Sequence, residues 1–185
     1  MRTFIALELS SGVRSQIGRL TTDLKDFLPE VRWVGLGNIH LTLRFLGEID
    51  PRGLSGLEQA VGEAAARTES FGLELGDIGF FGSARTPRVV WLGIQSSETL
   101  AGLAAEVEKA VREAGYGHAD KPFKPHLTLA RIRKPLKSPP DWERIRRLAP
   151  SQWPSWPVAE VLIIKSVLTP GGPVYETLAR CPLQE

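Results

Sequence analysis

The residues His, Leu, Thr and Leu occur twice in this order, at positions 40–43 and 126–129. In an extended strand alternate side chains share a face, so His40 and Thr42 lie on one side and the leucines on the other. His126 and Thr128 repeat this arrangement. Because imidazole titrates near neutrality, two histidines can supply one base and one acid, while threonine hydroxyls can donate to phosphate oxygens. The pattern favours in-line displacement at phosphorus without a metal.

Other chemistries fit the chain less well. It contains no Gly-x-Ser-x-Gly, no Walker A sequence and no Gly-x-Gly-x-x-Gly. One cysteine and three histidines are a poor supply for a closed zinc site, so we expect neither metal nor cofactor. His118 has no threonine two places on and is interpreted as a bystander. The competing structural interpretation is that the paired His and Thr only satisfy each other inside a core.

The elements that carry these residues recur at an offset of 86 residues. At this offset the strand-length segment Thr3–Ser10 falls on Val89–Ser96, and strand 39–45 falls on 125–131. Between them, apolar spacing predicts amphipathic helices, with Ser11 and Ser97 at the N-cap positions and Gly115 closing the second. Further helices are predicted at 51–67 and 140–148, and strands at 71–81, 158–168 and 174–180. Each half thus has the order β-α-β-α-β(β).

This order predicts an α+β fold with two pseudo-symmetric lobes. We expect a single bilobal domain, residues 1–185, built from repeats of about 1–86 and 87–185. Each lobe should hold an antiparallel sheet with its own helices on the outer face. The uncovered faces would then meet across a cleft, and the paired histidines and threonines would point into it.

Composition agrees with an ordinary globular protein, with 42% apolar and 24% charged residues and a net charge of +2. No apolar stretch is long enough to span a membrane or to act as a signal peptide, so we expect a cytoplasmic protein. Charge is unevenly distributed, since the segment 121–147 contains nine basic and two acidic residues. Such a segment attracts polyanions such as nucleic acid, although the charge pattern alone favours a solvated helix face with its flanking loop.

The paired motifs, with Phe45-Leu46-Gly47 after the first and Pro125 before the second, resemble the two-histidine phosphoesterase superfamily. The similarity is greatest to its RNA 2′,3′-cyclic phosphodiesterase branch, first described as 2′-5′ RNA ligases. It extends over nearly the whole chain, from the Phe4-Ile5-Ala6-Leu7 segment to the final hairpin. The resemblance implies a bilobal α+β fold whose two His-x-Thr strands line a central groove.

The resemblance also implies an activity, which is hydrolysis of RNA 2′,3′-cyclic phosphate ends to 2′-phosphates, with reversible ATP-independent 2′-5′ ligation in some members. By position, His40 would be the proton donor and His126 the proton acceptor, with Thr42 and Thr128 on the phosphate. It further points to Phe45 stacking on the terminal base and to Arg131 holding the phosphate.

Phe45 and Arg131 conflict with strand alternation, because each lies five residues after its histidine and so falls on the leucine face. They reach the substrate only if the strands end or bulge there, and Phe45 could equally belong to the core. Arg44, at an even step, is the alternative phosphate contact.

Two other functions are compatible with the sequence. One is a non-catalytic sensor of RNA ends or nucleotides, and the other is hydrolysis of a small cyclic nucleotide. The expected partner is RNA with a 2′,3′-cyclic phosphate end. No membrane and no protein partner are implied, and we expect a monomer.

Overall fold

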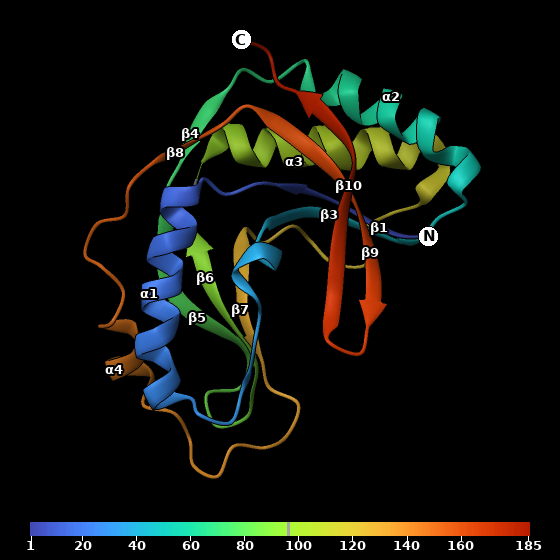
Figure 1. Ribbon diagram of the computed structural model, residues 1–185. Helices are drawn as coiled ribbons and strands as arrows, with labels where there is room; N and C mark the ends of the chain where they lie inside the picture. Colours follow the sequence, from blue (N-terminus) through green and yellow to red (C-terminus); the bar gives the residue numbers. More distant parts are fainter. Residues whose placement is uncertain (96) are drawn as a thin grey trace.

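The computed structural model describes residues 1–95 and 97–185, and these form two antiparallel four-stranded sheets. Sheet A has the order β10-β9-β1-β3 and sheet B the order β2-β7-β6-β5 (Figure 1). The strands of sheet A are β1 (Arg2–Leu7), β3 (Leu41–Glu48), β9 (Glu160–Thr169) and β10 (Gly172–Pro182). Those of sheet B are β2 (Arg32–Trp33), β5 (Leu75–Gly82), β6 (Pro87–Ile94) and β7 (His126–Arg131). Strands β4 (Phe71–Leu73) and β8 (Trp156–Val158) pair separately. The predicted α+β class is confirmed.

The helices are α1 (Ser11–Phe27), α2 (Leu54–Ala65), α3 (Glu98–Val111) and the short α4 (Trp142–Arg146). Short helical turns are η1 (Leu36–Asn38), η2 (Pro51–Gly53) and η3 (Arg112–Tyr116). Ser97 caps α3 as predicted, accepting from the Leu100 N–H at 3.2 Å. The first cap is one residue earlier than predicted, since Ser10 accepts from the Val13 N–H at 3.3 Å. Gly115 has φ +90°, a conformation that favours glycine where the helix turns away.

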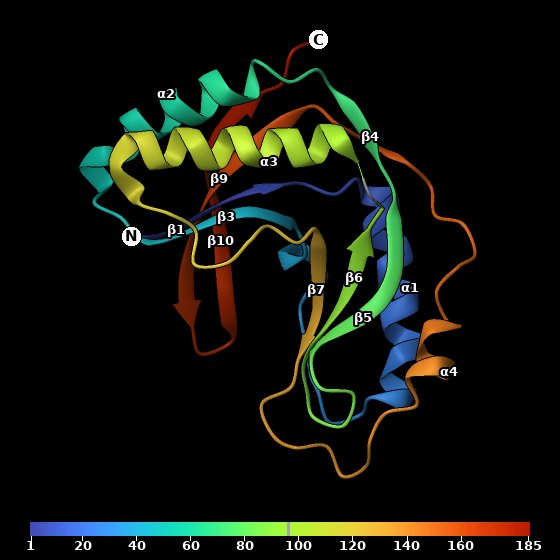
Figure 2. The same cartoon turned by 180° about the vertical axis from the view of Figure 1, so that it is seen from behind.

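The distribution of helices over the sheets differs from the prediction that each half covers its own sheet. Helices α2 and α3, one from each half of the sequence, lie together against sheet A (Figure 2). Helix α1 lies beside β5 and β6 of sheet B, next to α4 (Figures 1 and 2). Arg144 of α4 lies over the Phe27 ring of α1, 5.1 Å from its centroid. Helices α1 and α3 are therefore exchanged between the lobes.

The last strands of the two halves are exchanged as well. Strand β9 pairs with β1, and β5 pairs with β6, so the end of each half completes the sheet begun by the other. Alternation along a strand predicts two faces but not which neighbour completes the sheet, so this pairing was not foreseen. Each sheet consequently depends on both halves of the chain.

The main core lies between the sheets and their helices. The four leucines of the two motifs, Leu41, Leu43, Leu127 and Leu129, are all buried there, as strand alternation predicted. Their burial under the helices turns the alternate side chains of β3 and β7 toward the opposite faces of the sheets. Those faces form the candidate site.

Candidate active site

His40 and His126 stand at the starts of two neighbouring strands. His40 directly precedes β3, His126 begins β7, and the two strands lie next to each other where they start (Figures 1 and 2). The sequence prediction that the two motifs come together is in accord with this placement.

Each imidazole is held by the backbone two residues earlier in the chain. His126 Nδ1 lies 2.6 Å from the Lys124 carbonyl oxygen, and the backbone of Asn38 raises the pKa of His40. A carbonyl can only accept, so Nδ1 of His126 carries the hydrogen and Nε2 is left to take up or release a proton. Asn38 and Lys124 are related by the same offset as the histidines. The backbone two residues before each histidine therefore acts on its ring.

Both motif strands contain a bulge at the same position. Thr42 pairs with Ala6 and Arg44 with Ile5, which leaves Leu43 as the extra residue of β3. In β7, Thr128 pairs with Trp91 and Ala130 with Val90, which leaves Leu129 as the extra residue. A bulge shifts the alternation by one residue. The side chains five residues after each histidine therefore return to the histidine face.

These residues are Phe45 and Arg131, and the bulges resolve their conflict with strand alternation. Phe45 is 58% exposed, and its ring lies 5.7 Å from that of Phe4, which itself stacks on His40. Phe45 therefore does not belong to the core. Arg131 is also exposed, and its positive charge acts on Tyr175 of sheet A. Both side chains are exposed on the histidine face of their strands.

The same shift removes Arg44 from the site, contrary to the sequence-based alternative. Its side chain is only 8% exposed and points toward α3, where Nε lies 2.7 Å from Glu108 Oε2. Its guanidinium also donates to the carbonyls of Phe45 at 2.7 Å and Gly117 at 3.1 Å. Because these partners occupy it on the helix side, Arg44 fixes the end of β3 against α3 rather than contacting phosphate.

Aromatic residues that the sequence analysis missed surround both histidines. The His40 ring is stacked on Phe4 at 4.6 Å, with Tyr175 edge-on at 5.2 Å. His126 has Phe81 edge-on at 4.9 Å and Trp91 at 6.4 Å. These residues come from β1, β10, β5 and β6, and they carry no motif of their own.

Burial changes the acidity of two groups around His40. It lowers the pKa of His40 from 6.5 to about 4, because the charged ring loses solvation. The Asn38 backbone raises this pKa, whereas the positive charge of Arg14 lowers it further. Burial raises the pKa of Tyr175, against the opposing charges of Arg131 and Arg2. His40 is therefore neutral at pH 7 in the free protein.

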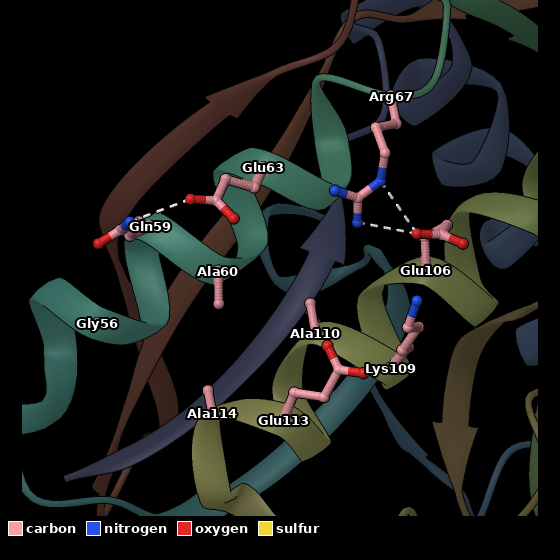
Figure 3. Close-up of a pocket in the computed structure, with 10 residues that line it drawn as sticks. All are labelled: Gly56, Gln59, Ala60, Glu63, Arg67, Glu106, Lys109, Ala110, Glu113 and Ala114. Carbon is pink, nitrogen blue, oxygen red and sulfur yellow. Dashed lines mark hydrogen bonds and ion pairs between the residues drawn. The ribbon is translucent and has the colours of Figure 1, made fainter.

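A cavity of about 130 Å³ adjoins His40 on the face of sheet A. It is lined by Glu8, Arg14, Gly37, Leu162, Ile164, Tyr175 and Thr177. A larger recess of about 640 Å³ lies between α2 and α3 on the outside of the same lobe (Figure 3). It contains no histidine, and its floor is formed by small residues such as Ala60 and Ala110. Volume alone would favour that recess, but the smaller cavity is the one that His40 lines.

Within the described residues, 1–95 and 97–185, no group of three His, Cys, Asp or Glu side chains is placed to hold a metal ion. Across the same residues, no helix is long and apolar enough to cross a membrane. Cys181 is buried, and burial raises the pKa of its thiol to about 11, so it is a poor nucleophile. The chemistry of the site is therefore to be sought in its side chains.

Two antiparallel sheets with exchanged strands, each containing a His-x-Thr strand, define the chain as a two-histidine phosphoesterase. The family model described as "LigT like Phosphoesterase" matches twice, over residues 7–91 and 92–175. The chain belongs to this LigT-like phosphoesterase family, and the resemblance inferred from the motifs is confirmed.

Curated relatives match over most of their length. A Thermus thermophilus protein is 36% identical over 197 residues, covering 100% of this chain and 91% of the relative. A Thermotoga maritima protein is 31% identical over 186 residues, covering 100% and 96%. Both are named RNA 2′,3′-cyclic phosphodiesterase.

Solved structures agree with this assignment. E. coli LigT complexed with 3′-AMP has a TM-score of 0.80 at 32% identity, covering 100% of this chain and 98% of that one. A crystal structure of a Thermus thermophilus protein reaches a TM-score of 0.82 at 31% identity with the same coverage.

Proposed function

We propose that this phosphoesterase hydrolyses the 2′,3′-cyclic phosphate at the end of an RNA strand to a 2′-phosphate. The observation that carries the proposal is the matching register of the two motif strands, in which bulges at Leu43 and Leu129 return Phe45 and Arg131 to the histidine face of each strand. The names of the relatives support the choice of substrate. In-line displacement needs a base and an acid on opposite sides of one phosphorus atom, and two related strands supply them.

In the proposed reaction His126 accepts a proton from water as the water oxygen attacks phosphorus. The bond from phosphorus to the ribose 3′-oxygen breaks, and His40 donates a proton to that oxygen. Thr42 and Thr128 donate hydrogen bonds to the non-bridging oxygens, where charge builds in the transition state. Arg131 adds positive charge at the phosphate, and Phe45 offers an exposed ring on which the terminal base can stack. Attack by the 5′-hydroxyl of a second RNA strand in place of water, with the same P–O3′ bond broken, would join two strands through a 2′-5′ linkage without ATP, and the reverse step would regenerate the cyclic phosphate.

The donor role requires that His40 acquire a proton, because its pKa is lowered to about 4 in the free protein. A cyclic phosphate diester carries a negative charge, and a negative charge at hydrogen-bond distance stabilises the imidazolium form. Substrate binding would also counter the charge of Arg14, which lowers the pKa of the ring. We therefore expect His40 to take up its proton together with the substrate. The assignment of donor and acceptor follows the family resemblance, since two equivalent motif strands do not distinguish the roles of their histidines.

The test is incubation of the protein with an oligoribonucleotide that ends in a 2′,3′-cyclic phosphate, in the presence of EDTA, followed by separation of the 2′- and 3′-phosphate products. Formation of the 2′-phosphate alone supports the proposal. Recovery of intact substrate that nevertheless binds would favour a non-catalytic sensor of RNA ends. A second incubation, with a 5′-hydroxyl RNA and no ATP, tests the ligation.

A further inference from the structure

Six cationic side chains gather at the end of sheet B where β7 leaves the cleft. We call them the sheet B cation cluster, which consists of Arg32, Arg85, Arg88, Arg131, Arg133 and Lys134. All six are exposed. Among the described residues, none of the six has a carboxylate within ion-pair distance, whereas Glu30, at the end of the loop that leads into β2, is paired with Lys137. The positive charge of the cluster is therefore available to a ligand.

Backbone pairing fixes the cluster in one place. Arg32 lies opposite Arg131 in the β2–β7 ladder, so these two side chains share the cleft face. The Ile132 N–H donates to the Arg88 carbonyl at 2.9 Å, which brings the segment after β7 beside β6. Arg85 lies in the turn that joins β5 to β6. That turn and the segment after β7 occupy the same end of the molecule (Figures 1 and 2).

The cluster is continuous with the candidate active site through Arg131. The Arg131 charge acts on Tyr175, which contacts His40, so one end of the cluster lies at the proposed phosphate position. Arg32 extends toward the β9–β10 turn, since a Cβ built on Gly172 would lie 3.4 Å from its Nη2. Arg133 and Lys134 follow directly in the exposed segment after β7.

Charge elsewhere in the molecule is differently arranged. The recess between α2 and α3 carries Glu63, Glu106 and Glu113 against Lys109 and Arg67 (Figure 3). Arg67 donates to Glu106 at 2.9 Å, so part of the positive charge there is already neutralised. That surface offers no continuous track for a polyanion, whereas the sheet B cation cluster does.

We propose that the sheet B cation cluster binds the phosphodiester backbone of single-stranded RNA upstream of the reacting end, which makes a polynucleotide rather than a mononucleotide the preferred substrate. This inference rests on the proposed function for its reacting end. Each cation that neutralises a phosphate of a single strand contributes about −0.7 to the slope of log affinity against log salt concentration. A mononucleotide, with one phosphate at the histidines, has nothing to place on Arg133 or Lys134.

The test compares the wild-type protein with the double variant Arg133→Ala/Lys134→Ala. Binding of an oligoribonucleotide of about ten residues, ending in a 2′-phosphate, is followed by fluorescence anisotropy from about 50 to about 200 mM KCl. The matched control is Lys109→Ala/Arg112→Ala, which removes the same charge from exposed positions on α3 and η3. Hydrolysis of 2′,3′-cyclic AMP is measured for all three proteins.

The expected result is a salt slope about 1.4 shallower for Arg133→Ala/Lys134→Ala, since two phosphate contacts are lost, with the control unchanged. The rate of hydrolysis of 2′,3′-cyclic AMP should be equal in the three proteins. Equal slopes in all three would overturn the inference and leave the proposed function intact. Absence of hydrolysis in the wild-type protein would contradict the proposed function, while the anisotropy comparison would still decide whether the cluster binds RNA.

Discussion

Acidification should destabilise the protein through His40, because this ring is buried in its neutral form. The unfolded chain binds a proton at a pKa of 6.5, whereas the folded protein does so only at about 4. As pH falls below 6.5, protons therefore bind first to the unfolded state, and the free energy of unfolding decreases. The decrease ends below about pH 4, where the folded state also becomes protonated. Above pH 6.5 this contribution is fully present.

The size of the effect follows from the difference between the two pKa values. One pKa unit corresponds to about 1.4 kcal/mol, so full loss across the window amounts to about 3 kcal/mol, and about 2 kcal/mol is lost between pH 7.5 and pH 5. Urea unfolding at these two pH values gives the change in the free energy of unfolding. The part that comes from groups other than His40 must then be removed. Subtracting the values for His40→Gln does this, since the substitution removes only the titrating ring.

The free energy difference between wild-type and His40→Gln should therefore shrink by about 2 kcal/mol on going from pH 7.5 to pH 5. A proton NMR titration of the His40 ring gives the folded-state pKa directly. A difference that stays constant between the two pH values, or a ring that titrates near 6.5, would refute the reasoning that burial beside Phe4 and Tyr175 keeps this ring neutral.

Three further predictions concern the site and its support. His126→Ala should lower kcat by at least about 10²-fold in single-turnover hydrolysis and leave RNA binding, measured by anisotropy, nearly unchanged. A variant that turns over at the wild-type rate would remove His126 from the mechanism. Phe45→Ala should weaken binding of the RNA end by about 1–3 kcal/mol through lost stacking, while thermal unfolding changes little because the ring is 58% exposed. Arg44→Met should lower the free energy of unfolding by about 2 kcal/mol, because Glu108 loses its partner in a mostly buried pair. The double variant Arg44→Met/Glu108→Leu should recover much of this free energy. An unchanged free energy of unfolding in the single variant would contradict the anchoring role.

The sequence predicted the chemistry-bearing part of the site because that information is local. A histidine and a threonine two residues apart share a face of any regular strand, and the intervening leucines identify the buried side. The offset of 86 residues indicated that the two strands are equivalent. These observations were enough to predict the fold class and the faces of both motif strands as far as Leu43 and Leu129.

The remaining features depend on pairing between distant strands. Whether Leu43 forms a bulge is decided by how β1 pairs with β3, and nothing within 40–45 specifies it. The placement of Arg44 depends on Glu108, which lies on a helix from the other half of the chain. The aromatic rings around His40 come from β1 and β10, so they enter the site only when the sheet is assembled.

The exchange of strands between the halves has a consequence for how such a molecule could have arisen. A free-standing single repeat would leave the first strand of its sheet without the neighbour that β9 or β5 now provides. Two separate copies could satisfy each other by reciprocal swapping, which would give a symmetric dimer with one histidine from each subunit at the shared site. Fusion of two such genes would then have freed the two walls to diverge, as Phe45 and Arg131 have at equivalent positions.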